Sequence, residues 1–381
     1  MSSSIQNAAK SLYEWLRSKD FKGHDPHDLL ESPFIPSLIK RSSYARLVLL
    51  QLGRRSPLDL HRLMKVPDAF NPKGGALILQ GLLRGREAVD PNWQEHATAL
   101  GDRLLGTAIK TKNGLGWGYP FDWQSKTHFV PKHTPTIVSS SFVGEALLDL
   151  YDLTGSEQVI FTATRIADYI TKDVSKRENK DGVSFGYSEG DKQIVFNASL
   201  LGAAFLARLG ARLGEDSYLR LAVDAARFVA KHQESSGRWA YGAGTSQKWT
   251  DSFHTGYVLL SLRQIDEIMG RRQFAGATHK GYAFYRSSFF RKDGLPRYFA
   301  NSDWPIDSHA AAHAILTLNE FGDHNAAQEI AQWLCGNMQN ADGSFGYQRH
   351  ERFTNKIPYI RWSNAWMFLA LATLLETDHT T

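Results

Sequence analysis

Cysteine is nearly absent from this chain of 381 residues, which has a single one, Cys335. One thiol excludes an intramolecular disulfide framework and a metal site built from several cysteines. No stretch approaches 18 uninterrupted apolar residues, so we expect no membrane span. The first residues have no cationic start followed by an apolar run, so we expect no signal peptide and a cytoplasmic location.

Runs of charge of one sign are also missing. The formal net charge is +5, which is modest for this length, and no Lys/Arg run of the kind found in nucleic-acid-binding arms is present. We therefore expect no nucleic-acid partner. Apolar residues make up 42% of the chain and charged residues 22%, as in ordinary globular proteins. These bulk properties leave the oligomeric state open.

What the chain does contain is an internal repeat. Apolar segments of helix length begin near Val138, Asn197, His254, His309 and Asn364, at spacings of 59, 57, 55 and 55 residues. Each is preceded by a loop in which glycine and an aromatic residue stand close together, such as 114–119, 181–187, 237–241, 293–298 and 342–347. A fixed period of this length indicates a repeat architecture, and here the unit is a helical hairpin.

Two kinds of helix alternate within the repeat. Residues 197–210 and 364–375 are apolar on nearly every side, which is typical of fully buried helices, whereas residues 215–231 have one polar face. This alternation favours an all-α fold with two concentric rings of helices, with an open superhelix as the rival. We also expect inner helices at 37–52 and 74–83, and outer helices at 5–18, 57–65 and 93–109. The count is then about seven hairpins, or six, in a single domain over 1–381 whose first two hairpins, about 1–85, are irregular.

One repeat carries a family resemblance. The segment Gln339-Asn-Ala-Asp342-Gly343-Ser344-Phe345-Gly346 resembles the Gln-x-x-Asp-Gly-Ser-aromatic-Gly repeat of terpene cyclases and of protein prenyltransferase β-subunits. Residues 253–257, Phe-His-Thr-Gly-Tyr, are similar to part of an inner helix of the prenyltransferases. The resemblance runs from about Gly114 to the C-terminus and implies an α/α toroid. Sugar epimerases, six- and seven-hairpin glycosidases and several uronate polysaccharide lyases share this architecture, so the fold alone does not fix the chemistry.

The chain departs from the isoprenoid enzymes at their functional residues. It has no Asp-x-Asp-Asp motif, which protonates the substrate in class II terpene cyclases, and no Asp/Cys/His set matching the prenyltransferase zinc site. The Cys and His zinc ligands of lanthionine-cyclase-like toroids are absent too. We therefore expect no cofactor and no metal, although His309 and His313, four residues apart, would share one helix face.

Polar residues gather where the inner helices begin. In a toroid these ends surround a common opening, so we predict that His254, His309, Asp251, Asp307 and Tyr241 are catalytic, since His and carboxylates can move protons. Helix capping is the alternative for the Asp, Ser and Asn residues, but not for the histidines.

Aromatic and basic side chains in the same loops suit an anionic sugar. We predict that the substrate is bound by Asn197, Trp117, Trp123, Lys248, Trp249, Arg297, Trp304, Arg361, Trp362 and Asn364.

The longest of these loops, 114–124, runs on past Lys126 to His128 and His133. The leading hypothesis is a carbohydrate-active enzyme on an acidic sugar or polysaccharide, with cell-surface polysaccharide synthesis as one setting. In a uronate epimerase or lyase, Asn197 or Arg361 would hold the carboxylate, His254 would abstract the C5 proton, and His309 or Tyr241 would donate one. In a glycoside hydrolase, Asp251 and Asp307 would be the acid and base. An isoprenoid cyclase or transferase and a non-catalytic glycan-binding scaffold are the alternatives.

Overall fold

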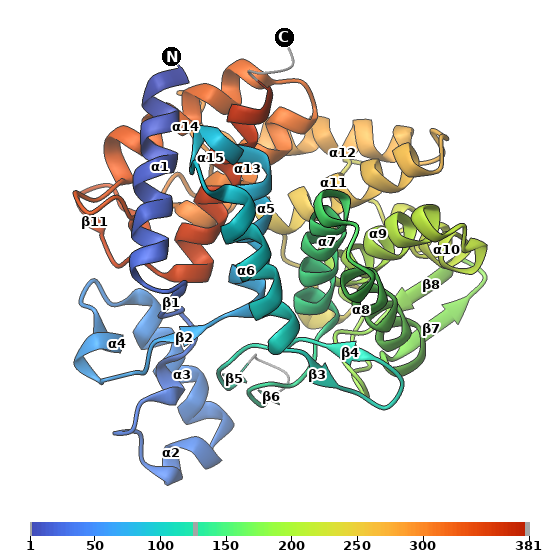
Figure 1. The fold of residues 1–381 in the computed structure, drawn as a ribbon, viewed down its shortest axis with the longest axis horizontal. Coiled ribbons are helices and arrows are strands. Elements are labelled where there is room, and N and C mark those ends of the chain that lie inside the picture. Colours follow the sequence, from blue (N-terminus) through green and yellow to red (C-terminus); the bar gives the residue numbers. More distant parts are fainter. Residues whose placement is uncertain (1, 125–128, 378–381) are drawn as a thin grey trace.

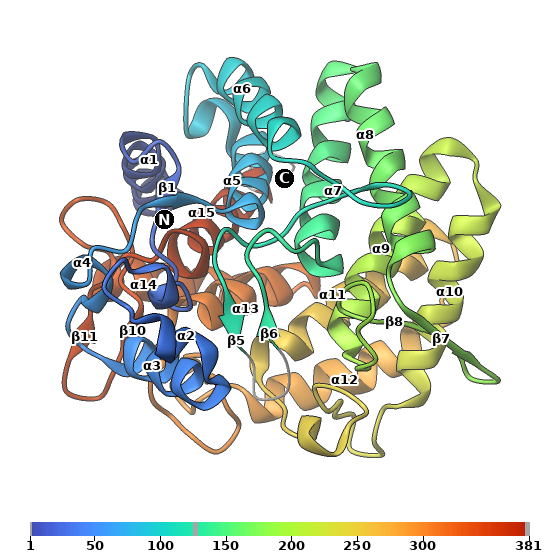
Figure 2. The same ribbon diagram turned by 90° about the horizontal axis from the view of Figure 1, so that it is seen from below.

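The computed structural model describes residues 2–124 and 129–377. Six inner helices form a closed ring (Figure 2), because each packs against the next and the last packs back against the first. They are α5 (Pro72–Gly85), α7 (Ile137–Thr154), α9 (Phe196–Leu213), α11 (Ser252–Ile268), α13 (Ser308–Glu320) and α15 (Trp366–Thr377). The fold is the expected α/α toroid, and the count is six hairpins.

A second layer of helices covers the ring from outside (Figure 1). These outer helices are α6 (Trp93–Gly106), α8 (Glu157–Asp168), α10 (Asp216–Lys231), α12 (Ala275–Ser288), α14 (His324–Met338) and α1 (Ser2–Ser18). The N-terminal helix α1 packs against α14 and α15, so the two ends of the chain together complete the last hairpin. None of the described helices combines the length and hydropathy that crossing a membrane requires.

Composition explains why the two layers differ. Nearly every residue of α9 and α13 is buried, whereas α10 buries Ala222, Ala225, Ala226, Phe228 and Val229 on one stripe. Inner helices must be apolar all round because they contact neighbours on every side, and outer helices need only one apolar face. Several inner helices begin at a side-chain cap, since Asn71, Thr136, Asp251 and Asp307 each accept a hydrogen bond from a backbone N–H of the first turn.

The prediction of an inner helix at 37–52 and an outer helix at 57–65 is wrong. This stretch forms short helices outside the ring, α2 (Ser37–Arg41), α3 (Ser43–Arg55) and α4 (Leu60–Leu63), at the end where the inner helices begin (Figure 1). Only Leu50 and Gly53 of α3 are buried, so this helix lacks the all-round apolar surface that an inner position requires. With η1 (Leu29–Glu31), this part builds a small separate core from Leu29, Leu30, Leu50 and Val66.

Short strands occur only in connections. The pairs are β1 (Lys22–Gly23) with β2 (Ala69–Phe70), β3 (Ile109–Lys110) with β4 (Leu115–Gly116), β5 (Trp123–Gln124) with β6 (Phe129–Val130), and β7 (Lys176–Asn179) with β8 (Gly182–Phe185). A further sheet joins β9 (Ile306–Asp307), β10 (Gln348–Arg349) and β11 (Thr354–Asn355), with β10 in the middle. All pairs are antiparallel. We call the end of the ring where the inner helices begin its mouth.

The repeated glycine turns join neighbouring hairpins. A Cβ built on Gly182 would lie 2.2 Å from the carbonyl oxygen of Asp224 in α10, the next outer helix. Gly114, Gly237 and Gly343 approach carbonyl oxygens of Arg165 in α8, Lys280 in α12 and Ser11 in α1 in the same way. The aromatic residue that follows each of these glycines is buried beneath the turn: Trp117, Phe185, Trp239 and Phe345. Only glycine allows this approach, which explains why the motif recurs.

We expect Gly343→Ala to lower stability more than Gly294→Ala. Both glycines have positive φ, +91° and +83°, so an alanine at either position is strained by about 1 kcal/mol. A Cβ at Gly343 would also lie 2.5 Å from the carbonyl oxygen of Ser11, whereas one at Gly294 meets nothing within 4 Å. The clash adds about 1–3 kcal/mol. Thermal unfolding of the two variants checks this, and equal losses would contradict the proposed contact.

Candidate functional site

The best-defined polar pair at the mouth is Asp251 with His254. Asp251 precedes α11 and caps it, and its Oδ1 accepts a hydrogen bond from the backbone N–H of His254 at 2.8 Å. Its Oδ2 lies 2.8 Å from Nδ1 of the His254 ring. A carboxylate only accepts hydrogen bonds, so Nδ1 carries the proton, and Nε2 of the neutral ring is left with a lone pair. Within the described part of the chain, no hydrogen bond occupies Nε2.

Aromatic rings flank His254 on the side of the mouth. Tyr241 and Trp249 stack with ring centroids 4.3 Å apart, and both rings lie at a steep angle to the imidazole, with centroids 4.8 and 5.5 Å from it. Trp249 is 41% exposed and the His254 side chain 21%, while Asp251 is buried beneath them. Burial, followed by the nearby charge of Asp251, raises the pKa of Tyr241, so this phenol stays protonated at neutral pH. The group therefore offers a base, a phenolic acid and a stacking surface.

Asn197 completes this group. It lies at the start of α9 and, with Tyr241, Asp251 and His254, lines a cavity of about 10 Å³. Such a volume is about the room that one water molecule needs. Its buried Oδ1 has no hydrogen-bond partner among the described residues. An unpaired buried amide beside an oriented histidine is typical of a site that receives a polar ligand atom.

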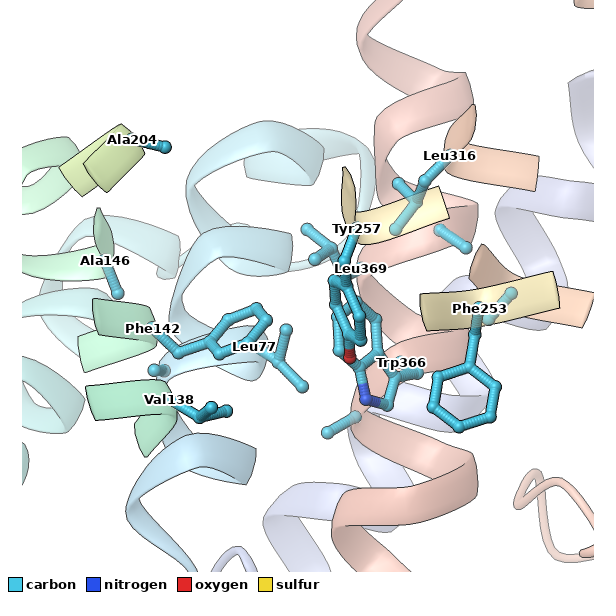
Figure 3. Packing of buried hydrophobic residues seen from close by; sticks show 14 of the residues in the cluster. Leu77, Val138, Phe142, Ala146, Ala204, Phe253, Tyr257, Leu316, Trp366 and Leu369 are labelled. Carbon is cyan, nitrogen blue, oxygen red and sulfur yellow. The ribbon is translucent and has the colours of Figure 1, made fainter. Parts of the chain in front are cut away.

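The centre of the ring holds a second cluster, which is sealed from solvent. Phe142, Tyr257 and Trp366 come from three different inner helices (Figure 3), and their ring centroids lie 5.5 to 5.9 Å apart. The hydroxyl of Tyr257 lies 3.2 Å from Nε2 of His309, and the ammonium group of Lys73 donates to the same hydroxyl at 3.4 Å. His309 is therefore placed against Tyr257 and not toward the cavity beside His254. The two histidines are connected through Phe253, whose ring centroid lies 4.1 Å from one and 4.5 Å from the other.

Lys73 is a functional candidate that the sequence analysis missed. It lies in the first turn of α5, with Nζ 4.3 Å from the centroid of Phe142 and 5.4 Å from those of Tyr257 and Trp366. Burial holds the pKa of Lys73 well below its usual value, and the charge of Arg361 adds to this. The aromatic rings favour the charged form, but none of the described carboxylates is within ion-pair distance, so desolvation decides. The only sequence signal was a lysine opening an otherwise apolar helix.

His309 and His313 are buried in the same cluster. Burial, followed by the charge of Lys73, holds the pKa of His309 well below its usual value and lowers that of His313 to about 3. Both rings are therefore neutral at pH 7. In the described ranges, no group of three or more His, Cys, Asp or Glu side chains is arranged to hold a metal ion.

Arg361 forms a buried ion pair at the mouth. Its Nε and Nη2 donate to Oδ2 and Oδ1 of Asp25 at 2.6 and 2.8 Å, and both residues are buried. The guanidinium also lies over the rings of Tyr119 and Trp362, at 5.0 and 5.4 Å. Arg361 is predicted from the sequence to hold the carboxylate of a substrate. In the structure it holds the carboxylate of Asp25, which follows β1 in the same chain. Sequence reasoning could not pair two residues that are 336 positions apart.

Asp307 serves as a helix cap. Its Oδ1 accepts from the backbone N–H groups of His309 and Ala310 at 3.0 and 3.2 Å, and Trp362 Nε1 donates to it at 3.2 Å. Gln348 donates to Oδ2 at 2.8 Å. With both oxygens bonded and the residue buried, Asp307 has no oxygen free to act as acid or base on a sugar. Capping, the alternative reading of this residue, accounts for what the structure shows.

Two further candidates are held in structural contacts. Asn364 accepts from the N–H of Phe345 and donates to the carbonyl oxygens of Phe345 and Tyr359, so its amide holds the last glycine turn. Trp117 is completely buried, and its Nε1 donates to the carbonyl of Leu104. A fully buried ring cannot stack on a substrate, so the prediction for Trp117 is corrected.

The remaining predicted binders lie around the mouth without joining His254. Trp123 in β5 packs 5.9 Å from the ring of Tyr187, and Lys248 is exposed. Arg297 pairs with Asp303 at 2.6 Å, and Arg291 lies over Trp304. Lys126 and His128 fall outside the described residues. Of the predicted site, then, the structure brings together Asn197, Tyr241, Trp249, Asp251 and His254.

The fold can be compared with that of solved structures. The Lin0763 protein from Listeria innocua superposes on this chain with a TM-score of 0.65 at 12% sequence identity, over 99% of this chain and 98% of that one. Cellobiose 2-epimerase from Bacillus thermoamylovorans B4167 has a TM-score of 0.64 at 11% identity, over 82% of this chain and 88% of that one. The family 76 α-mannanase BT2949 from Bacteroides thetaiotaomicron has a TM-score of 0.62 at 12% identity, over 81% of this chain and 87% of that one. At such identities the likeness establishes the α/α-toroid fold.

Sequence comparison adds nothing to this. No protein-family model matches the chain, and no curated protein matches it either.

We expect Lys73→Met to stabilise the protein at neutral pH. Burial lowers the pKa of Lys73 in the folded state, so the folded chain gives up this proton at a lower pH than the unfolded chain, whose lysine pKa is the ordinary 10.5. The unfolded chain therefore binds more protons below pH 10.5, and stability should rise as the pH approaches that value, by at most about 1.4 kcal/mol per pH unit for one proton. The variant removes this dependence, and its advantage should shrink as the pH approaches 10.5.

Thermal unfolding from pH 7 to pH 10.5 provides the measurement, with exposed Lys19→Met as the control. A variant that is less stable than the parent at pH 7 and shows the same pH slope would contradict the lowered pKa of Lys73.

Proposed function

We propose that this chain is a carbohydrate-active enzyme that moves a proton at an acidic sugar, as a uronate epimerase or lyase does. The observation that carries the proposal is His254, which lines a small cavity, has Nδ1 held by a buried carboxylate, and has Nε2 free of hydrogen bonds to the described residues. A fixed tautomer with an accessible lone pair is what a general base requires. The fold shared with a cellobiose epimerase adds support, as analogy.

Each neighbour of His254 has a role in this reaction. His254 would abstract the C5 proton through Nε2, and Asp251 would stabilise the imidazolium that forms. Tyr241, protonated and 4.8 Å from the imidazole between ring centroids, would donate a proton. The exposed face of Trp249 would stack on the sugar ring. Asn197, through its amide NH2, is better placed than Arg361 to donate to the substrate carboxylate, because Arg361 is occupied by Asp25, and the unpaired Oδ1 of Asn197 could accept from a sugar hydroxyl.

The geometry disfavours the other candidate functions. Hydrolysis by Asp251 and Asp307 would need two carboxyl groups free to reach the glycosidic bond, and both are buried caps. An isoprenoid transferase would need acidic residues holding magnesium around a diphosphate, and the described residues contain no group that could hold a metal. A non-catalytic glycan-binding toroid would not need an imidazole that is oriented through Nδ1 and has Nε2 free of hydrogen bonds.

We expect His254→Gln to abolish proton transfer while leaving the fold intact. Loss of a general base lowers the rate by about 10²–10⁴-fold. The assay follows solvent deuterium entering C5 of uronate glycans and the appearance of unsaturated chain ends, because one reports epimerisation and the other elimination. His279→Gln, on the exposed surface of α12, is the control. New reducing ends without either signal would indicate a hydrolase, and binding without turnover a scaffold; both outcomes contradict the proposal.

Asp251→Asn tests the orientation of the ring. Asparagine still caps α11 through its carbonyl oxygen, so we expect little change in unfolding temperature. It cannot stabilise the imidazolium or fix the same tautomer, so the rate should fall by about 10²-fold or more. The pH dependence of kcat should also change, which a purely structural role would not cause. An unchanged rate and pH profile would remove Asp251 from the mechanism.

A further inference from the structure

Exposed apolar side chains are concentrated in one part of the molecule. Residues 33–67, which we call the mouth segment, contain seven of the large apolar side chains that stay exposed: Phe34, Leu38, Tyr44, Val48, Leu52, Leu58 and Leu63. Four others, Phe129, Trp249, Phe299 and Phe353, lie in loops that lead into inner helices. A concentration of exposed apolar side chains in one part of a protein is typical of an interaction site.

Helix α3 organises part of this surface. Tyr44, Val48 and Leu52 are spaced four residues apart, so they form one stripe along the helix. Tyr44 is 77% exposed and Leu52 59%, while Leu50 on the opposite side packs into the small core with Leu29 and Val66. The mouth segment thus shares a small core with Leu29 and Leu30 of η1, and the exposed stripe is a surface that this core leaves uncovered.

The charge of the mouth segment indicates what covers the stripe. It contains seven Lys and Arg residues and one acidic residue, Asp59, a formal charge of +6, whereas the whole chain has +5. Five of these basic side chains are exposed, and no ion pair among the described residues involves them: Lys40, Arg41, Arg55, Arg62 and Lys65. The rest of the chain has a formal charge of −1, so a second copy offers no net negative charge comparable with the +6 of this segment. Apolar stripes flanked by Lys and Arg suit the headgroup region of an anionic bilayer.

We infer that the mouth segment docks on the surface of an anionic lipid bilayer, with the stripe of α3 inserted among the headgroups. The docking surface lies beside the mouth, because α3 packs against β5, and Arg54 reaches to within 6.0 Å of the ring centroid of Trp362. A bound bilayer therefore faces the mouth of the ring (Figure 1). This inference does not depend on the proposed reaction, since no residue of the His254 group takes part in it.

The test is flotation of the full chain with vesicles. We expect binding to vesicles of phosphatidylcholine mixed with phosphatidylglycerol, little binding to phosphatidylcholine alone, and weaker binding at high salt. Replacing Tyr44, Val48 and Leu52 together by Ser should lower the partition coefficient on the order of 100-fold. Replacing Lys40, Arg41, Arg55 and Arg62 by Gln should lower it roughly fivefold per residue.

Matched controls use exposed residues elsewhere on the surface. Phe161→Ser on α8 removes a side chain that is 64% exposed, and Arg271→Gln with Arg272→Gln removes exposed charges beyond the end of α11. Neither control should change vesicle binding. Absence of binding to anionic vesicles, equal loss in the controls, or a dimer that the stripe substitutions dissociate without any vesicle binding would each overturn the inference. Unfolding temperatures of all variants separate these outcomes from misfolding.

Discussion

The close approach of the glycine turns to the next outer helix is the contact on which the ring depends. Four turns place a glycine against a backbone carbonyl one hairpin further on, and the last of them, Gly343, rests on Ser11 of α1. That contact joins the C-terminal hairpin to the N-terminal helix and so helps to close the ring. The buried aromatic side chain under each turn fills the space between hairpins, and Trp117, Phe185, Trp239 and Phe345 are all but inaccessible to solvent. Closure in turn brings the beginnings of all six inner helices to one mouth.

The repeat made much of this architecture predictable. The expected starts at Val138, Asn197, His254 and His309 lie within two residues of the observed helix starts, and the caps Asp251 and Asp307 were recognisable from sequence. Residues 37–52 were misjudged because apolar content was read as burial. Tyr44, Val48 and Leu52 do follow helical spacing, but their stripe faces solvent. Periodicity specifies that a helix has an apolar face, and it does not specify what covers that face.

The site was predictable only in part, for a related reason. Sequence located polar residues at helix starts, where one residue type serves both as cap and as catalyst. Asp251 and Asp307 are both buried caps, and they differ only in whether a histidine side chain takes the second oxygen, as His254 does. Lys73 and the pair of Arg361 with Asp25 gain their character from burial and from partners distant in sequence. Such properties exist only once the ring has closed.

The electrostatics of the mouth follow from this construction. Six helix beginnings direct partial positive charge toward the same end, and Lys73 and Arg361 are buried there. The chain supplies one carboxylate, Asp25, to neutralise Arg361, and burial lowers the pKa of Lys73, which has no carboxylate beside it among the described residues. His254 stands apart, since Asp251 would balance a proton on its ring. Among the described residues of this group, His254 therefore combines a carboxylate that would stabilise its charged form with a ring nitrogen, Nε2, that no hydrogen bond occupies, and this combination suits acid–base chemistry at the mouth.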